Sequence, residues 1–203
     1  MFRIAKVISW PATLKECHMA SIVVVGDGPG GLSAALFLAR ANNSVVVFGT
    51  DNTVMNFAFL NNYLGIEGIS GTDFQTKARM QVTDAGVQLV NEEVLSVETT
   101  DGKFVVRTDD TEQTADYLIL SEGKSMPLAN SLGIQITSGE DDLVSVDRDG
   151  RTEISRLYVI GRSARPTRSQ AIISAGDGAV AALDILAEPE GKDVQDWDSP
   201  PKD

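Results

Sequence analysis

A short β-branched run that leads into a glycine-rich loop constrains this chain more than any other feature of its sequence. Residues 22–25 read Ile-Val-Val-Val, an unbroken apolar run that is typical of a buried parallel strand. The loop that follows fits the pattern G-x-G-x-x-G at Gly26, Gly28 and Gly31. Residues 32–40 then carry apolar side chains at helical spacing. Because strand, loop and helix follow in this order, we expect a dinucleotide-binding α/β fold.

Each glycine of the loop has a separate physical task in such a fold. Gly26 permits the tight turn, Gly28 lets the backbone approach a pyrophosphate, and Gly31 lets the helix pack closely on the strand. The free N–H groups and the partial positive charge of the helix N-terminus then face the phosphates. Pro29 and Gly30 complete the predicted binding loop. Glycine-rich turns also occur for purely structural reasons, so the motif gains its meaning from the strand before it and the helix after it.

Further apolar runs predict the rest of a three-layer Rossmann-like domain. Parallel strands are expected in the central sheet at 22–25, 45–48, 87–90, 117–120 and 157–160. Helices are expected at 71–85, capped by Ser70 or Thr72, and at 169–186. A hairpin signal, Thr-Asp-Gly-Lys at 100–103, predicts a small antiparallel meander across about 93–109 that packs on one face of the sheet.

The composition suggests one domain with less regular ends. We expect the dinucleotide-binding domain, for FAD or NAD(P), to span 19–187, because 1–18 has no clear hydrophobic period and Met19 directly precedes the first strand. Residues 1–18 are therefore interpreted as an N-terminal extension outside the fold, and the sequence leaves open whether translation starts at Met1 or Met19. Residues 188–203 are charged and contain prolines, which predicts a disordered acidic tail.

Charge and cysteine content limit the partners and the compartment. The formal net charge of −12 makes nucleic acid and anionic membranes poor partners. No apolar run approaches the roughly 20 residues that cross a bilayer, so no membrane association is expected. With 18 Asp against 11 Glu and 10 Arg against 7 Lys, a halophilic surface is favoured slightly over an ordinary acidic one. The single cysteine, Cys17, excludes an internal disulfide and indicates a reducing compartment, the cytoplasm.

An acidic residue is expected after the second strand, where it would accept hydrogen bonds from the adenosine ribose. Gly49 occupies the usual position, and Asp51 follows two residues later. Asp51 is therefore the candidate ribose ligand. The alternative is that Asp51 is a polar residue of an ordinary turn.

Five sequence blocks, in order, resemble thioredoxin reductase and its flavoprotein relatives. They are the glycine loop at 26–31, F-G-T-D at 48–51, N-Y-L-G with G-I-S-G at 62–71, D-Y-L-I-L-S-E-G at 116–123, and the stretch 152–186. The resemblance implies that the cofactor is FAD. It also implies cofactor contacts, beyond the loop and Asp51, at Asn62, Val94, Gly123, Gly161, Arg162, Gln170 and Ala171.

The sequence also departs from the pattern of that family at several positions. Between its fourth and fifth blocks the family carries an NADPH domain with a C-x-x-C redox pair, but here only 124–151 intervenes, and it contains no cysteine. Arg162 stands where the family has an aspartate that accepts hydrogen bonds from the ribityl chain, and arginine has no acceptor. Ser121-Glu122 replaces the family's Ala-Thr before Gly123.

Four arginines fall within 13 residues of an otherwise acidic chain: Arg156, Arg162, Arg165 and Arg168. One interpretation is bidentate contact with a pyrophosphate or another anionic ligand. The other is surface ion pairing with the surrounding acids. The sequence does not decide between them.

Two functions remain open at this stage. The first is an FAD-binding, single-domain oxidoreductase related to thioredoxin reductase, without its own NADPH domain or redox disulfide, which exchanges electrons with a separate partner protein or a small reductant. The resemblance also suggests a homodimer. No catalytic side chain and no metal site is expected, and the lone histidine, His18, lies outside the predicted domain. The second is a non-enzymatic, flavin-free descendant that binds another nucleotide or a protein. Arg162 and Glu122 favour this second interpretation. Substrate, electron donor, electron acceptor and oligomeric state stay undetermined.

Overall fold

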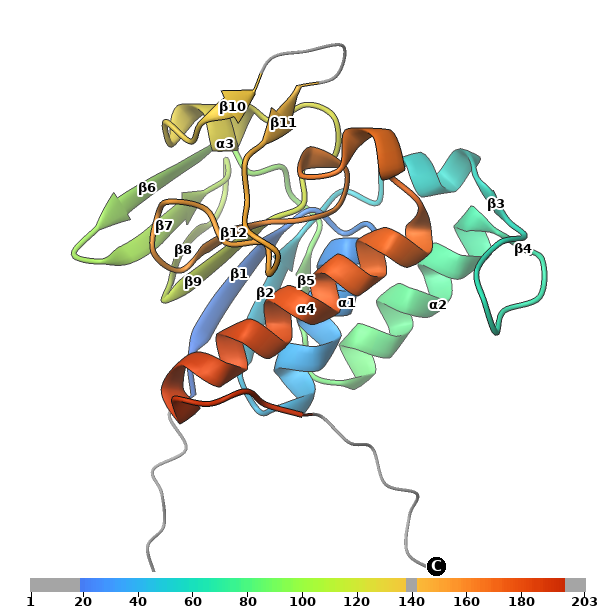
Figure 1. Ribbon diagram of the computed structural model, residues 1–203, viewed down its shortest axis with the longest axis horizontal. Coiled ribbons are helices and arrows are strands. Elements are labelled where there is room, and N and C mark those ends of the chain that lie inside the picture. The colour runs from blue at the N-terminus through green and yellow to red at the C-terminus, as the bar shows by residue number, and fades with distance from the viewer. Residues whose placement is uncertain (1–18, 138–141, 196–203) are drawn as a thin grey trace, which may run out of the picture.

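The central sheet of the protein is parallel and five-stranded. The computed structural model describes residues 19–137 and 142–195, so the predicted extension at 1–18 and the last residues of the predicted tail lie outside the described residues. The strands are ordered β12-β9-β1-β2-β5 (Figure 1). Their bounds are β1 Ser21–Val25, β2 Ser44–Phe48, β5 Gln88–Val90, β9 Tyr117–Leu120 and β12 Leu157–Val159. The predicted α/β fold is thereby confirmed.

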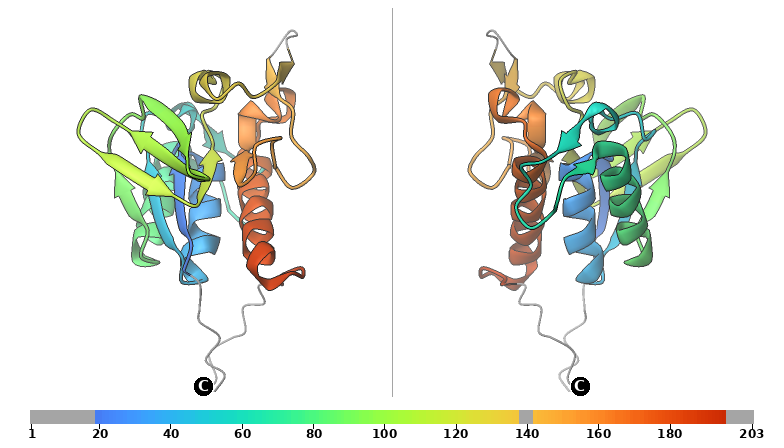
Figure 2. Two further views of the ribbon diagram at one scale, coloured as in Figure 1. Left: turned by 90° about the vertical axis from the view of Figure 1, so that its left-hand side faces the viewer. Right: turned by 90° about the vertical axis from the view of Figure 1, so that its right-hand side faces the viewer.

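Both faces of this sheet are covered, which gives three layers (Figure 2). One face carries the helices α1 (Pro29–Arg40), α2 (Gly71–Asp84) and α4 (Ala171–Glu190). The other carries the antiparallel meander of β6 (Ser96–Thr100), β7 (Lys103–Arg107) and β8 (Glu112–Ala115). Side chains of β1 alternate between the two cores: Val24 packs on the helical side and Val23 on the meander side. Burial on both faces explains why these strands are mainly apolar in sequence.

Short elements connect the layers. They are η1 (Val54–Phe57), β3 (Phe59–Leu60), β4 (Ile69–Ser70), α3 (Pro127–Ser131), β10 (Ile136–Thr137), β11 (Leu143–Val144), η2 (Gly161–Ser163) and η3 (Pro166–Arg168). The described part of 124–151 folds as α3 and the two-stranded sheet β10–β11. Within the described ranges, no helix combines the length and the apolar character needed to cross a membrane.

Three predicted elements need corrected boundaries. Helix α1 begins at Pro29 rather than 32, because proline fits the first helical turn. The meander extends past 109 to Ala115; β8 reads Glu-Gln-Thr-Ala and buries only Ala115, so it has no apolar pattern. Helix α4 starts at Ala171 rather than 169 and runs beyond the predicted domain end at 187 to Glu190, where Gly191 in a left-handed conformation (φ 63°) closes it.

Two tyrosines of the sheet hold α4 in place. The hydroxyl of Tyr158 donates to Asp184 (2.7 Å), which also pairs with Arg151. One helical turn later, the hydroxyl of Tyr117 donates to Glu188 (2.8 Å). Glu188 in turn pairs with Arg156, whose guanidinium stacks on the Tyr117 ring. The hydrogen bond between Tyr117 and Glu188 keeps the last turn of α4 against the sheet. The helix therefore extends beyond its predicted end.

Helices α1 and α4 cross closely because small residues meet at the crossing. A Cβ added to Gly178 would lie 2.1 Å from the carbonyl oxygen of Gly30. A Cβ added to Gly30 would lie 3.1 Å from the carbonyl oxygen of Ser174. This close approach brings the N-terminal turns of both helices to the carboxyl ends of β1, β9 and β12, which is where parallel α/β sheets bind ligands.

Candidate functional site

Two glycines of the loop after β1 are required by packing. Gly26 has a left-handed φ of 103°, and a Cβ there would lie 2.3 Å from the carbonyl oxygen of Ser121. Its N–H donates to the carbonyl of Phe48 at 2.8 Å, so the loop is tied to β2. A Cβ on Gly31 would lie 2.0 Å from the carbonyl oxygen of Gly26. The tasks predicted for Gly26 and Gly31, a tight turn and close helix packing, match these contacts.

Gly28 is different, because neither its backbone nor its neighbours require glycine. Its φ of −72° and ψ of −178° are open to any residue. Among the described residues, a Cβ there would meet only the Thr53 hydroxyl, at an unstrained 3.7 Å. Gly28 is also the N-cap of α1, and no side chain of this residue caps the first N–H groups of the helix. The protein itself thus leaves this position free for the close approach of a ligand.

Asp27, between the first two glycines, was missed by the sequence reasoning. It is 5% exposed, pairs with Arg79 of α2, and accepts a hydrogen bond from the N–H of Asp51 at 3.0 Å. Burial raises the pKa of its carboxyl group, and the Asp51 N–H and the Arg79 charge oppose that rise. The signal was present in the sequence as an acid within the loop, opposite Gly49.

Asp51 lies exposed at the end of β2 with a left-handed φ of 56°. Its N–H is held by Asp27, and its carbonyl accepts a 2.6 Å hydrogen bond from the amide of Asn56. The backbone is therefore fixed on both sides, while the carboxylate projects from the turn. The ribose contact predicted for Asp51 remains a prediction.

Glu122, a departure from the family pattern, has a structural partner. Its carboxylate accepts hydrogen bonds from the N–H groups of Leu128 (2.9 Å) and Ala129 (3.2 Å) at the start of α3. Burial raises its pKa, and these two N–H groups oppose the rise. Next to it, Gly123 takes a left-handed φ of 82°, and its carbonyl accepts the Ser163 hydroxyl at 2.8 Å. Glu122 is therefore accounted for by the capping of α3.

The end of β12 and the start of α4 form the opposite side of the candidate site. Gly161 has a left-handed φ of 68°, and Arg162 follows it in η2. Within the described part of the chain, the Nε of Arg162 is buried and has no hydrogen-bond partner. Gln170 is the N-cap of α4, Ala171 is its first residue, and the Gln170 amide oxygen accepts a 3.0 Å hydrogen bond from Asn62.

Two of the four arginines form ion pairs with acids of α4. Arg156 pairs with Glu188 (2.7 Å) in the last turn of α4, and Arg165 pairs with Asp177 (2.8 Å). Surface ion pairing is therefore the correct interpretation for Arg156 and Arg165. Arg162 keeps its unpartnered Nε beside the candidate site.

Val94 stands apart from the other predicted contacts. It lies just before β6, half-buried, and packs against the core on the meander side of the sheet. The contacts that join the rest of the site run between the glycine loop, Ser121 and Gly161, and they do not include Val94.

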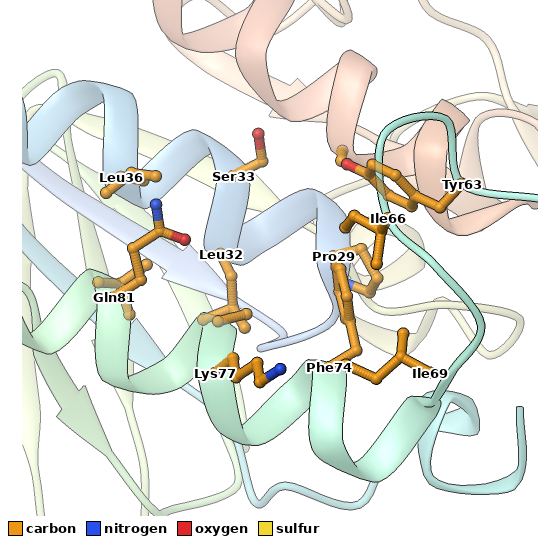
Figure 3. A pocket seen from close by; sticks show the side chains of 13 residues that line it. Pro29, Leu32, Ser33, Leu36, Tyr63, Ile66, Ile69, Phe74, Lys77 and Gln81 are labelled. Atoms are coloured by element: carbon orange, nitrogen blue, oxygen red, sulfur yellow. The ribbon is translucent and has the colours of Figure 1, made fainter. Parts of the chain in front are cut away.

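A cavity of about 440 Å³ opens on the helical side, between α1, α2 and the loop before β4 (Figure 3). Its lining is mainly apolar and includes Leu32, Leu36 and Phe74, with Lys77 at its edge (Figure 3). Pro29 lines it, but none of the other predicted site residues does. Gly28 itself does not line this cavity.

The sheet order and the loop define a Rossmann-like dinucleotide-binding domain. Residues 20–130 match the model of the family described as pyridine nucleotide-disulphide oxidoreductase. The chain belongs to this family.

Sequence relatives agree with this assignment, and a solved structure agrees with the fold. The chain is 32% identical over 111 residues to "NADPH-dependent thioredoxin reductase 3" of Arabidopsis thaliana, which covers 51% of this chain and 21% of that protein. It is 31% identical over 117 residues to a thioredoxin reductase of Spironucleus barkhanus, covering 55% and 38%. The matches thus span well under half the length of these relatives. The fold also resembles a thioredoxin reductase from Gloeobacter violaceus, with a TM-score of 0.78, 17% identity, and coverage of 88% of this chain and 99% of that one.

Proposed function

We propose that this domain binds FAD and exchanges electrons with a separate partner. The observation that carries the proposal is Gly28, a glycine that neither backbone conformation nor packing requires, at the N-terminus of α1. A pyrophosphate would use that space and the N–H groups behind it. The buried, unpartnered Nε of Arg162 is a second feature that an anionic or hydroxyl-rich group would satisfy.

Specific residues would hold the cofactor. The glycine loop would bind the pyrophosphate, Asp51 the adenosine ribose, and Arg162 the phosphates or the ribityl chain. Gly123, Gly161, Gln170, Ala171 and Asn62 would complete the contacts around the loop, and Val94 would add one from the meander side of the sheet. FAD supplies hydride and single-electron transfer, whereas the chain supplies binding and electrostatics.

Electrons would come from outside the domain. The stretch 124–151 contains no cysteine and no second glycine loop, and its described part forms only α3 and a small sheet. We therefore propose a redox partner protein, or a small reductant, rather than direct reduction by NADPH. The single cysteine favours a reducing compartment such as the cytoplasm.

A partner would find apolar surface beside the site. Phe57 lies just before β3, Leu64 lies in the same β3–β4 loop as Asn62, and their side chains are 90% and 89% exposed. A partner that covered both would remove their apolar surface from water. Either a second copy of the chain or a redox protein would fit. A measurement of the molar mass in solution shows whether the chain forms a dimer.

The second candidate function is a flavin-free descendant. Arg162 still favours it, because a guanidinium replaces the acceptor that the resemblance implies. Glu122 no longer does, since it caps α3.

The test is the absorbance spectrum of the purified protein, with mass spectrometry of any released cofactor. Flavin bands and a mass of FAD, present as isolated or after reconstitution, support the proposal. A colourless protein that does not take up FAD contradicts it. Rapid anaerobic bleaching of bound flavin by NADPH alone would contradict the separate electron source.

A further inference from the structure

The carboxyl group at the end of β2 comes from the glycine loop rather than from β2 itself. Gly49 follows β2 at the position where dinucleotide-binding folds usually place an acid. A Cβ added to Gly49 would lie 2.3 Å from Cγ of Asp27 and 2.6 Å from its Oδ1. The Asp27 carboxylate therefore fills the space that a side chain at position 49 would occupy.

Asp27 connects three elements through this carboxylate. Its Oδ2 accepts the N–H of Asp51 (3.0 Å) and pairs with Nη1 of Arg79 from α2. Gln75, also on α2, donates from its side-chain amide to the Asp27 carbonyl (2.5 Å). Since the Asp27 side chain is 7% exposed and that of Arg79 is 21% exposed, this pair is shielded from solvent.

This arrangement fixes the charge that an adenosine ribose would meet. Two carboxylates, Asp27 and Asp51, lie at the end of β2, and the guanidinium of Arg79 is already engaged by Asp27. Ribose hydroxyls can donate to a carboxylate, whereas a 2′-phosphate would bring negative charge against both acids. Accommodating a 2′-phosphate requires a nearby arginine that is available to it.

We propose that Asp27 is a positioning residue that makes this site accept a dinucleotide with a free ribose 2′-hydroxyl and reject a 2′-phosphorylated one. It acts through the backbone of Asp51, which it orients, and through Arg79, which it withholds from the ligand. The inference rests on the proposed function and narrows its ligand class to dinucleotides such as FAD or NAD.

The test measures how well ADP-ribose and its 2′-phosphorylated form compete with bound FAD. The wild-type chain should favour ADP-ribose at least tenfold. Asp27→Asn keeps an oxygen acceptor for the Asp51 N–H but frees Arg79, so the preference should fall at least fivefold. The double variant Asp27→Asn with Arg79→Gln should regain part of the preference, because the freed guanidinium is gone and the Asp51 carboxylate remains.

Asp184→Asn is the matched control. Asp184 also pairs with an arginine, Arg151, but it lies on α4 away from the glycine loop. Loss of that pair lowers stability without changing the preference. A preference altered equally by Asp27→Asn and Asp184→Asn would mean a merely structural role and would overturn the proposal.

The remaining outcomes distinguish a failure of the proposed role of Asp27 from a failure of the proposed FAD binding. If Asp27→Asn does not fold, the single variant Arg79→Gln provides the test. Because it leaves the Asp27 carboxylate in place, the preference for ADP-ribose should not weaken. A weaker preference overturns the proposal. If the wild-type chain binds FAD without preference between the competitors, or with neither competing, Asp27 is not selective and the proposed function stands. If it binds neither FAD nor the competitors, the proposed function fails first.

Discussion

The side-chain amide of Asn62 donates a 3.0 Å hydrogen bond to the amide oxygen of Gln170, across 108 positions of the sequence. Asn62 lies in the loop between β3 and β4, and Gln170 caps α4. Both residues are predicted cofactor contacts. The bond joins two sides of the candidate site that the sequence keeps far apart.

Replacing Asn62 by alanine should affect binding more than stability. The bond links exposed side chains, so its loss should lower the free energy of unfolding by about 1 kcal/mol or less. If the pair orients Gln170 toward the flavin, FAD affinity should fall at least fivefold. Titration with FAD and denaturant unfolding measure the two effects. Gln113→Ala, which removes an exposed amide on β8, is the control and should leave affinity unchanged.

Gly28→Val should fold and lose its cofactor. A Cβ at Gly28 meets only the Thr53 hydroxyl at 3.7 Å, so stability should fall by only about 1 kcal/mol, the usual cost of a poor N-cap. The branched side chain would occupy the pyrophosphate position and should reduce FAD affinity more than a hundredfold. Gly31→Val is the contrast, because its Cβ would lie 2.0 Å from the Gly26 carbonyl oxygen and should destabilise the fold itself. A folded Gly28→Val protein that retains FAD would show that the loop is misassigned.

Arg162→Asp should weaken FAD binding by roughly tenfold or more, which corresponds to about 1.4 kcal/mol. The variant removes a charge-assisted contact worth about 1.5–3 kcal/mol and adds negative charge near the phosphates. Both proteins are titrated at the same salt concentration, because screening weakens phosphate contacts. Arg165→Asp is the control, since Arg165 already pairs with Asp177. Tighter binding by Arg162→Asp would favour the flavin-free descendant.

Glu122→Ala should cost stability and spare the cofactor. It removes the acceptor for the Leu128 and Ala129 N–H groups, and the loss of such a cap costs about 0.5–2 kcal/mol. FAD affinity should change less than threefold. Glu122→Gln retains an oxygen acceptor and should recover part of the lost stability. A large fall in affinity with little change in stability would instead place Glu122 against the cofactor.

Stability should decline between about pH 10 and pH 12 partly through Tyr117. Burial, and then its hydrogen bond to Glu188, raises the pKa of this hydroxyl to about 12, against about 10 in an unfolded chain. The folded state holds the proton of this hydroxyl more tightly than the unfolded chain does. The contribution of Tyr117 to the free energy of unfolding is therefore fully present below pH 10 and is lost as the pH rises to 12. Denaturant unfolding across this window should therefore show a shallower decline for Tyr117→Phe. Equal slopes would mean that Tyr117 ionises as it does in the unfolded chain.

Much of the fold could be predicted because its signals are local. The five parallel strands appear as short, mainly apolar runs, since most of their residues are buried between the two outer layers. Strand β8 could not be predicted, because its pairing with β7 depends on backbone hydrogen bonds and only Ala115 is buried. The true end of α4 depends on the contact between Glu188 and Tyr117, which lie 71 positions apart.

The sequence by itself determined the α/β class, the glycine loop and the residues that could meet a dinucleotide, because strand period, helix period and glycine spacing are properties of neighbouring residues. Only the tertiary structure decided what the charged residues of the site do. Asp27 occupies a position that the glycine pattern leaves open, and Glu122 stands out only as a departure from the family, yet Asp27 is buried against Arg79 and Glu122 caps α3. A charged side chain pairs with whichever group the fold brings close to it, and a buried charge without such a partner would destabilise the fold.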